Sequence, residues 1–221
     1  MDDRSLTTPA PSVEATQDQV SPFSRQELRS LLRSPLHAMD VLLMQRQRFA
    51  SNVALEHRLP TMALVLFAMT ALFALPFGAV LGLTSLWRVA AMLLGGLLIC
   101  LPSLHIFGRY LGARLSWQQT LCVSLSGIAV ASLFTFAFAP ILGFLRVTMT
   151  DAQLVTPGAM AILLLVCALF AGIGQLLRLL RNEATLRGIG PSVARVLLPW
   201  LALYVFITLR LASALGLFQD L

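Results

Sequence analysis

The sequence predicts an all-α protein: a polytopic membrane bundle of five transmembrane helices preceded by a cytoplasmic amphipathic helix. Hydrophobic residues make up 57% of the 221 residues and charged residues only 12%, about half the charged share of a soluble domain. Mean hydropathy is +0.82, and the apolar residues gather in blocks close to the ~20 residues that a helix needs to cross a bilayer. This composition excludes a disordered chain and an ordinary soluble enzyme.

Two segments come before the first apolar block. Residues 1–23 are rich in Pro, Ser and Thr and lack the apolar run of a signal peptide, so we expect a disordered tail. Residues 24–58 are predicted to form the amphipathic segment, because Ser24 and Glu27 fit a capping box and leucines follow at helical spacing. The charged residues of this segment prevent it from spanning the membrane. We expect it to lie either on the membrane surface or against its own bundle, and the bundle to fold without residues 1–58.

Residues 59–221 are predicted to be the transmembrane domain. Pro76 is expected to kink the first span, and Pro140 to kink or end the long third block. The predicted spans are 61–83, 89–107, 118–142, 157–177 and 196–217.

The arginines indicate which way the chain crosses the membrane. All 16 basic residues are Arg. Seven precede the first block, two separate the second from the third, and four separate the fourth from the fifth, whereas only Arg88, Arg146 and Arg210 fall on the opposite side. Because basic loops stay in the cytoplasm, this asymmetry predicts a cytoplasmic N-terminus and a C-terminus on the outer side. The absence of Lys is typical of a GC-rich genome, which suggests a bacterial inner membrane.

The net charge of +6 is better explained by an anionic bilayer than by nucleic acid, since no aromatic residues alternate with the arginines. We therefore expect the lipid bilayer, its anionic headgroups and other membrane or cytoplasmic proteins as partners, and no nucleic acid. The residues predicted to meet anionic lipid or an acidic partner are Arg46, Arg48, Arg58, Arg181, Arg187 and Arg210. For Arg210, in the fifth block, two alternatives stay open: it snorkels outward, or it contacts a polar group in the bundle.

The apolar blocks offer little chemistry. They contain no Asp or Glu, which disfavours a proton- or sodium-coupled transporter. His105 is expected to be a satisfied interfacial histidine, and Ser124 a small polar residue at a helix-packing face. The three cysteines lack metal-site spacing. We predict no enzymatic activity, no catalytic residue, no cofactor and no metal site.

The run from Phe107 to Leu121, with glycines, arginines and Ser116-Trp117, is similar to the entry into the third span of the Yip1 family. The stretch Leu32 to Pro35 resembles the Leu-x-x-Pro segment of that family's bacterial members. The acidic Asp-Leu-Tyr-Gly-Pro signature of eukaryotic members is missing. The resemblance implies five spans and a non-enzymatic role in membrane organisation or trafficking, without the Rab-partner role.

Three functions remain open from the sequence. The leading hypothesis is a non-enzymatic, Yip1-like membrane scaffold or adaptor. The first alternative is an accessory subunit of a larger transport or electron-transfer complex. The second is a channel or solute carrier that uses the spans interrupted at Pro76, Pro102 and Pro140.

Overall fold

The computed structural model describes residues 58–110, 116–148, 157–186 and 192–217, together with the single positions Glu27, Ser30, Met44, Phe49 and Val53. Side chains are described over 58–110, 116–148, 158–178 and 200–217 and at those five positions. The predicted disordered tail and most of the predicted amphipathic segment lie outside this part of the chain.

Five long α-helices and one short 3₁₀ turn make up the described bundle. They are α5 (Leu59–Leu81), η1 (Leu83–Ser85), α6 (Arg88–Tyr110), α7 (Trp117–Thr148), α8 (Pro157–Leu186) and α9 (Ser192–Ala214). No strand occurs among the described residues, so the prediction of an all-helical protein is confirmed there. The helices coincide with the predicted apolar blocks, and α8 continues well beyond residue 177.

Four of the helices are long and apolar enough to cross a membrane: Leu59–Leu81, Leu83–Tyr110 (with the η1 turn), Trp117–Thr148 and Gly158–Arg178. They support the prediction of an integral membrane protein. In the fifth helix, α9, the described apolar stretch is shorter and covers Trp200–Ala214.

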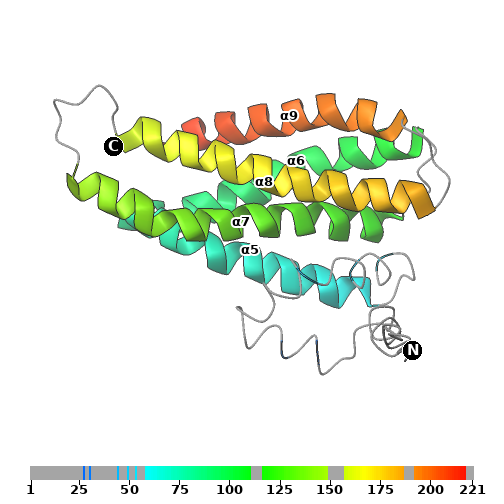
Figure 1. Ribbon diagram of the computed structural model, residues 1–221, viewed down its shortest axis with the longest axis horizontal. Helices are drawn as coiled ribbons and strands as arrows, with labels where there is room; N and C mark the ends of the chain where they lie inside the picture. Colours follow the sequence, from blue (N-terminus) through cyan, green and yellow to red (C-terminus); the bar gives the residue numbers. More distant parts are fainter. Residues whose placement is uncertain are drawn as a thin grey trace, which may run out of the picture.

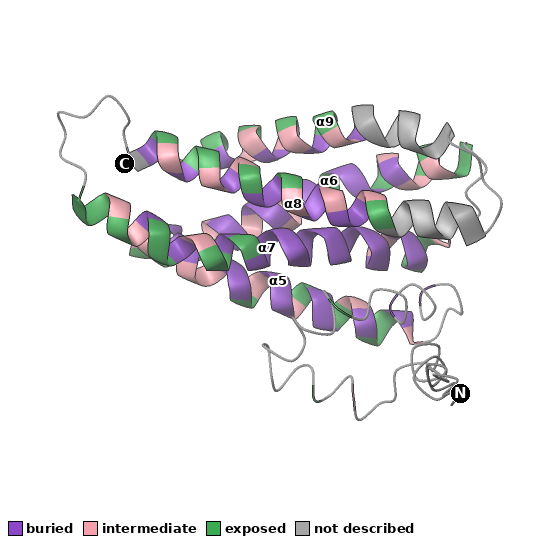
Figure 2. Ribbon diagram, in the orientation of Figure 1, coloured by how far each residue is buried: buried purple, intermediate pink, exposed green. Residues whose placement is uncertain are grey.

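The helices lie side by side and reverse direction from one to the next (Figure 1). As a result, the start of α5, the end of α6, the start of α7 and the end of α8 share one end of the bundle, which we call the Arg58 end. The turn between α5 and α6 and the end of α7 lie at the other end, which we call the Arg146 end. Helix α7 packs mainly on α5 and α8, whereas α9 packs mainly on α6. Because α7 lies between α5 and α8, its first part is buried on almost every side (Figure 2).

Small residues allow the closest helix contacts. A Cβ added to Gly127 of α7 would lie 3.1 Å from the carbonyl oxygen of Gly172 in α8, so the two backbones touch at this crossing. A Cβ on Gly96 of α6 would lie 2.8 Å from Oγ1 of Thr208 in α9. Membrane helices lack a hydrophobic force toward one another, so close backbone packing of this kind holds them together.

Proline does not end any of the predicted blocks. Helix α5 continues through Pro76, α6 through Pro102, and α7 through Pro140 as far as Thr148. Of the two alternatives for Pro140, the end of the helix is therefore wrong. Each proline lacks the N–H that would bond back to the preceding turn, and neighbouring helices compensate for such gaps in a bundle.

Helix α7 begins with a reciprocal cap, which was not among the expected features of the sequence. The backbone N–H of Ser116 donates to Oε1 of Gln119 over 2.9 Å, and the backbone N–H of Gln119 donates to Oγ of Ser116 over 3.3 Å. Ser-x-x-Gln is a capping-box pattern, and it fixes where the central helix starts.

Candidate functional site

The six arginines predicted to bind lipid or a partner do not form one cluster. Arg46, Arg48 and Arg187 lie outside the described residues. Arg181 belongs to the last part of α8, at the Arg58 end, and its side chain is not described. Arg210 lies on α9 toward the opposite end (Figure 1), so it does not join Arg58.

Arg58 has an unusual conformation at the start of α5. Its backbone is left-handed, with φ 53° and ψ 35°, and its carbonyl oxygen accepts the N–H of Met62 over 3.1 Å. It is the one non-glycine residue with positive φ in the described chain. Its side-chain nitrogen Nη1 is buried and has no hydrogen-bond partner among the described residues. A charged donor in that state is costly, which makes Arg58 the strongest of the predicted positions.

Arginines at the Arg146 end are engaged differently. Arg146 donates through Nη1 to the carbonyl oxygen of Val80, in the last turn of α5. Arg88 donates through Nη1 to the carbonyl oxygen of Gly216, just after α9, over 3.4 Å. Both cations satisfy carbonyl groups at helix C-termini, where positive charge is favourable. Two of the three arginines that break the charge asymmetry therefore have structural partners.

Arg210 has an exposed side chain, and its guanidinium carbon lies 6.0 Å from the ring centroid of Phe206. This is a cation–π contact one helical turn back along α9. Of the two alternatives, outward snorkelling fits this placement better than a polar contact inside the bundle.

Part of the segment before α5 packs against the bundle. Phe49 and Val53 are 3% and 1% exposed and belong to the hydrophobic core. The amide Nε2 of Gln119 donates to the carbonyl oxygen of Val53 over 3.0 Å. At these two positions the segment therefore packs against its own bundle, which is one of the two alternatives expected from the sequence. Removal of residues 1–58 would take these two side chains out of the core, so we expect that deletion to cost stability.

His105 and α7 meet at the Arg58 end. The ring nitrogen Nδ1 of His105 lies 3.1 Å from Oγ1 of Thr120, and its ring meets that of Trp117 edge-on at 5.0 Å. Thr120 also donates to the carbonyl oxygen of Ser116 over 3.1 Å. These contacts fit the expectation of a satisfied histidine and tie the end of α6 to the start of α7.

Buried hydroxyl groups of α7 are used locally. Ser124 donates to the carbonyl oxygen of Thr120 over 2.6 Å, and Ser126 to that of Val123 over 2.6 Å. Ser132 and Thr135 do the same one turn back in the helix. Such bonds satisfy hydroxyls in an apolar setting and leave them without the geometry of an activated nucleophile. Within the described ranges, no group of three or more His, Cys, Asp or Glu residues could hold a metal ion.

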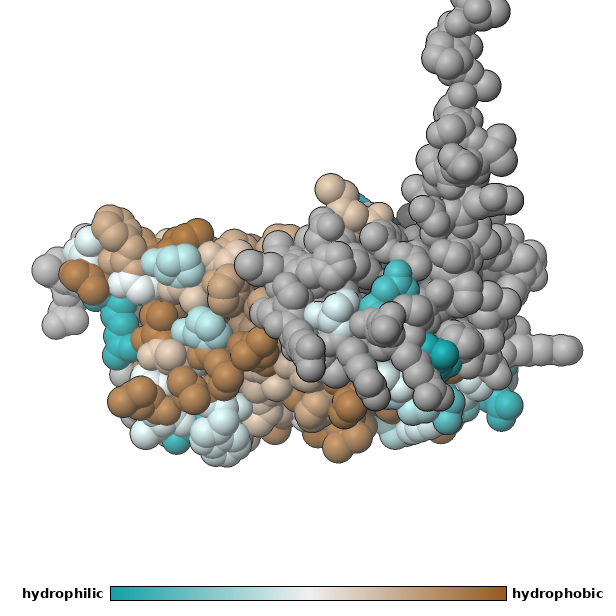
Figure 3. Space-filling model, turned by 90° about the horizontal axis from the view of Figure 1, so that it is seen from below, coloured by the Kyte–Doolittle hydropathy of each residue, from teal (hydrophilic) through white to brown (hydrophobic). Residues whose placement is uncertain are grey.

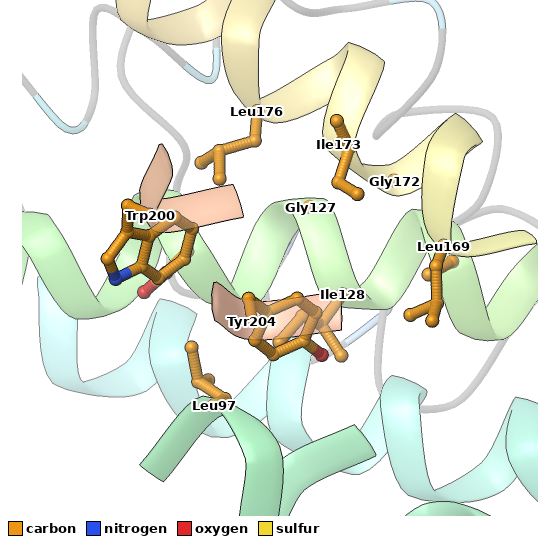
Figure 4. Close-up of a pocket in the computed structure, with 11 residues that line it drawn as sticks. Leu97, Gly127, Ile128, Leu169, Gly172, Ile173, Leu176, Trp200 and Tyr204 are labelled. Carbon is orange, nitrogen blue, oxygen red and sulfur yellow. The ribbon is translucent and has the colours of Figure 1, made fainter. Parts of the chain in front are cut away.

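A small cavity lies between α6, α7, α8 and α9 (Figure 4). Its volume is about 20 Å³, room for about one water molecule. Trp200 and Tyr204 stack beside it with ring centroids 5.8 Å apart. Their polar tips turn to α6: Trp200 Nε1 donates to the carbonyl oxygen of Cys100 over 3.1 Å, and the Tyr204 hydroxyl to that of Leu93 over 3.3 Å. The cavity is therefore lined mainly by apolar atoms.

A larger groove lies between α5 and α6, with α7 as its floor. Its volume is about 550 Å³, within the range of small-ligand sites. Ala63 and Phe67 line one wall, Ala91 and Leu98 the other, and Leu125 the floor. This groove could not be predicted from the sequence, because no local pattern shows how far two apolar helices separate. Much of the middle of the described face in Figure 3 is apolar, and its most hydrophilic residues lie toward the two ends.

Comparison with known proteins adds no relative. No protein-family model matches the chain, and neither a characterised protein nor a solved structure matches it.

Proposed function

We propose that this chain is a non-enzymatic integral membrane scaffold or adaptor of the Yip1-like type, with five spans, in a bacterial inner membrane. In this proposal α9 is the fifth span, the N-terminus is cytoplasmic and the C-terminus lies on the outer side. The 23-residue length of α9 supports a fifth crossing. Its packing on α6 supports one as well.

One observation carries the proposal: the segment before α5 is anchored at the end of the bundle where arginines gather. Val53 is buried and bonded to Gln119 near the start of α7. The described arginines at this end include Arg58, Arg109 and Arg178, and the latter two are exposed. A surface that combines a docked segment with exposed cations suits an acidic partner or an anionic membrane.

The channel or carrier alternative has less support. The cavity between α6, α7, α8 and α9 has room for about one water molecule and is lined mainly by apolar atoms. The prolines that interrupt the helices do not line it. An accessory subunit would be part of a large complex of several proteins, so the mass of the purified particle distinguishes this alternative from the scaffold.

The test is partner recovery from detergent with a deletion that spares the core. Removal of residues 1–43 leaves Phe49 and Val53 in place, whereas removal of 1–58 does not. We expect the shorter deletion, and also Arg46→Gln with Arg48→Gln, to abolish recovery of stoichiometric partners while the melting temperature stays unchanged. Arg210→Gln, which removes one arginine at the opposite end of the bundle, is the control. Unchanged recovery in both test variants would contradict the adaptor role, and a large multi-protein particle that is insensitive to them would favour the accessory subunit.

A further inference from the structure

We propose that the groove between α5 and α6 binds one anionic phospholipid, with an acyl chain in the groove and the phosphate at Arg58. This site goes beyond the scaffold role, since it depends only on the chain lying in a bilayer.

The groove results from two helices that meet at one end and separate toward the other. At the Arg146 end, a Cβ on Gly78 would lie 2.6 Å from the carbonyl oxygens of Ser85 and Leu86, so α5 and the following turn are in close contact. Toward the Arg58 end the two helices diverge (Figure 1). The resulting space is lined almost entirely by apolar side chains of α5 and α6, with two leucines of α7 behind them.

The groove opens toward the surroundings of the bundle. Phe67 and Leu98, on opposite walls, are 50% and 71% exposed. In a bilayer these surroundings are acyl chains. Along α6 the residues that line the groove extend from Ala91 to Leu101, about 15 Å of helix and about half of the ~30 Å hydrocarbon core. Its length therefore suits a chain from one leaflet.

Charge at one end of the groove selects the headgroup. Arg58 stands two residues before Pro60, which lines the groove. Its Nη1 has no partner in the described part of the protein, whereas Arg88 and Arg146 each bind a carbonyl oxygen. The sequence has no Asp or Glu from His57 to Thr150. Among the described residues no acceptor reaches this nitrogen, so a lipid phosphate could supply one, and the start of α5 adds a favourable dipole.

The experiment measures lipid binding to the purified full chain by native mass spectrometry. The probes are phosphatidylglycerol and phosphatidylcholine with identical acyl chains. We expect wild type to retain one phosphatidylglycerol with about tenfold preference, the size of one charge-assisted hydrogen bond. Arg58→Gln should reduce this preference to that of phosphatidylcholine. Arg210→Gln, which removes an exposed arginine at the other end, should leave it unchanged.

A second pair of variants tests the acyl part. Ala63→Phe and Ala91→Phe fill the groove from opposite walls and should lower retention of both lipids. Ala202→Phe, at an exposed position of α9, is the bulk-matched control and should have no effect. Melting temperatures identify variants that fail to fold. If one of the two groove variants does not fold, the other still tests whether an acyl chain occupies the groove.

Several results would overturn the site. Equal retention of the two lipids would mean that charge does not select the headgroup. Equal losses in Arg58→Gln and Arg210→Gln would mean that only bulk charge acts. Retention unchanged in both groove variants would mean that no chain enters the groove. Binding seen only after removal of residues 1–43 would make this chain's own segment the occupant, and dimers lost in Ala63→Phe would indicate a second copy. None of these results bears on partner recovery, so a failure here is distinct from a failure of the adaptor role.

Discussion

The side-chain amide of Gln119 donates a hydrogen bond to the carbonyl oxygen of Val53 across 3.0 Å, between residues 66 positions apart. The same side chain accepts the N–H of Ser116. Gln119 therefore caps the central helix and fastens the preceding segment to the bundle with one amide group.

Replacement of Gln119 by Ala should loosen this attachment. Gln119 is 3% exposed, so the change leaves the Val53 carbonyl and the Ser116 N–H without their partner and should destabilise the fold by about 1–3 kcal/mol. We expect a lower melting temperature in detergent and faster proteolysis before residue 58. Gln118→Ala is the control, because Gln118 is the exposed neighbour. Equal behaviour of the two variants would show that the bond does not anchor the segment.

The crossing of α7 and α8 should not tolerate a side chain at its glycines. A Cβ on Gly172 would clash with the carbonyl oxygen of Gly127 and lie 2.8 Å from the Cβ of Ala131. Gly172→Ala should destabilise the bundle by about 1–3 kcal/mol, the usual cost of overpacking.

Gly174→Ala, two residues further along α8, is the matched control for this crossing. Apart from the backbone of α8 itself, no described atom lies within 4 Å of an added Cβ there, so this change should stabilise the helix slightly, by up to about 1 kcal/mol. Thermal unfolding measures both changes, and a neutral Gly172→Ala would mean that the helices can separate at no cost.

Trp200→Phe should weaken the contact between α6 and α9. The change removes an indole N–H that lies 3.1 Å from the carbonyl oxygen of Cys100 and 3.2 Å from Oγ of Ser103. Interhelical hydrogen bonds in membranes contribute about 0.6 kcal/mol on average and up to about 1.7 kcal/mol. Unfolding in a graded detergent series should show a loss of that size. Trp87→Phe, at a 58% exposed position, should show none, and equal losses would contradict this assignment.

The proposed orientation predicts which loops meet each side of the membrane. In a background where Cys100, Cys122 and Cys167 are replaced by Ala, Arg114→Cys and Arg187→Cys should react with a membrane-impermeant maleimide from the same side. Thr84→Cys, in the exposed turn after α5, should react from the opposite side. Labelling of Arg114→Cys and Arg187→Cys from different sides would contradict the five-span topology.

The helices themselves could be predicted from the sequence. An apolar run long enough to cross a bilayer is a local property, and so is the capping pattern at Ser116 and Gln119, although the latter was overlooked. The central position of α7 in the bundle was harder to predict. Its block resembles the others in hydropathy, and only its neighbours on both sides explain why Ser124 and Gln119 are buried.

The candidate site divides in the same way. In the sequence, Arg58 is one of many arginines near an apolar block, and nothing distinguishes it from the others. Its left-handed backbone, and a side-chain nitrogen without a partner among the described residues, are visible only in the structure. The groove that begins two residues later depends on how α5, α6 and α7 pack. Arg88 and Arg146 were assigned only to the outer side, and the structure adds their partners at the ends of α9 and α5.

The sequence by itself determined that the chain forms apolar helices, and it predicts that most of its arginines fall on one side of them, because partition between lipid and water acts on each segment separately. Only the tertiary structure decided which helices touch, where they separate into a groove, and which cations find a carbonyl oxygen. In a bilayer every apolar face is equally well solvated, so helix pairing is selected by the shape of small residues such as Gly127 and Gly172 and by a few hydrogen bonds.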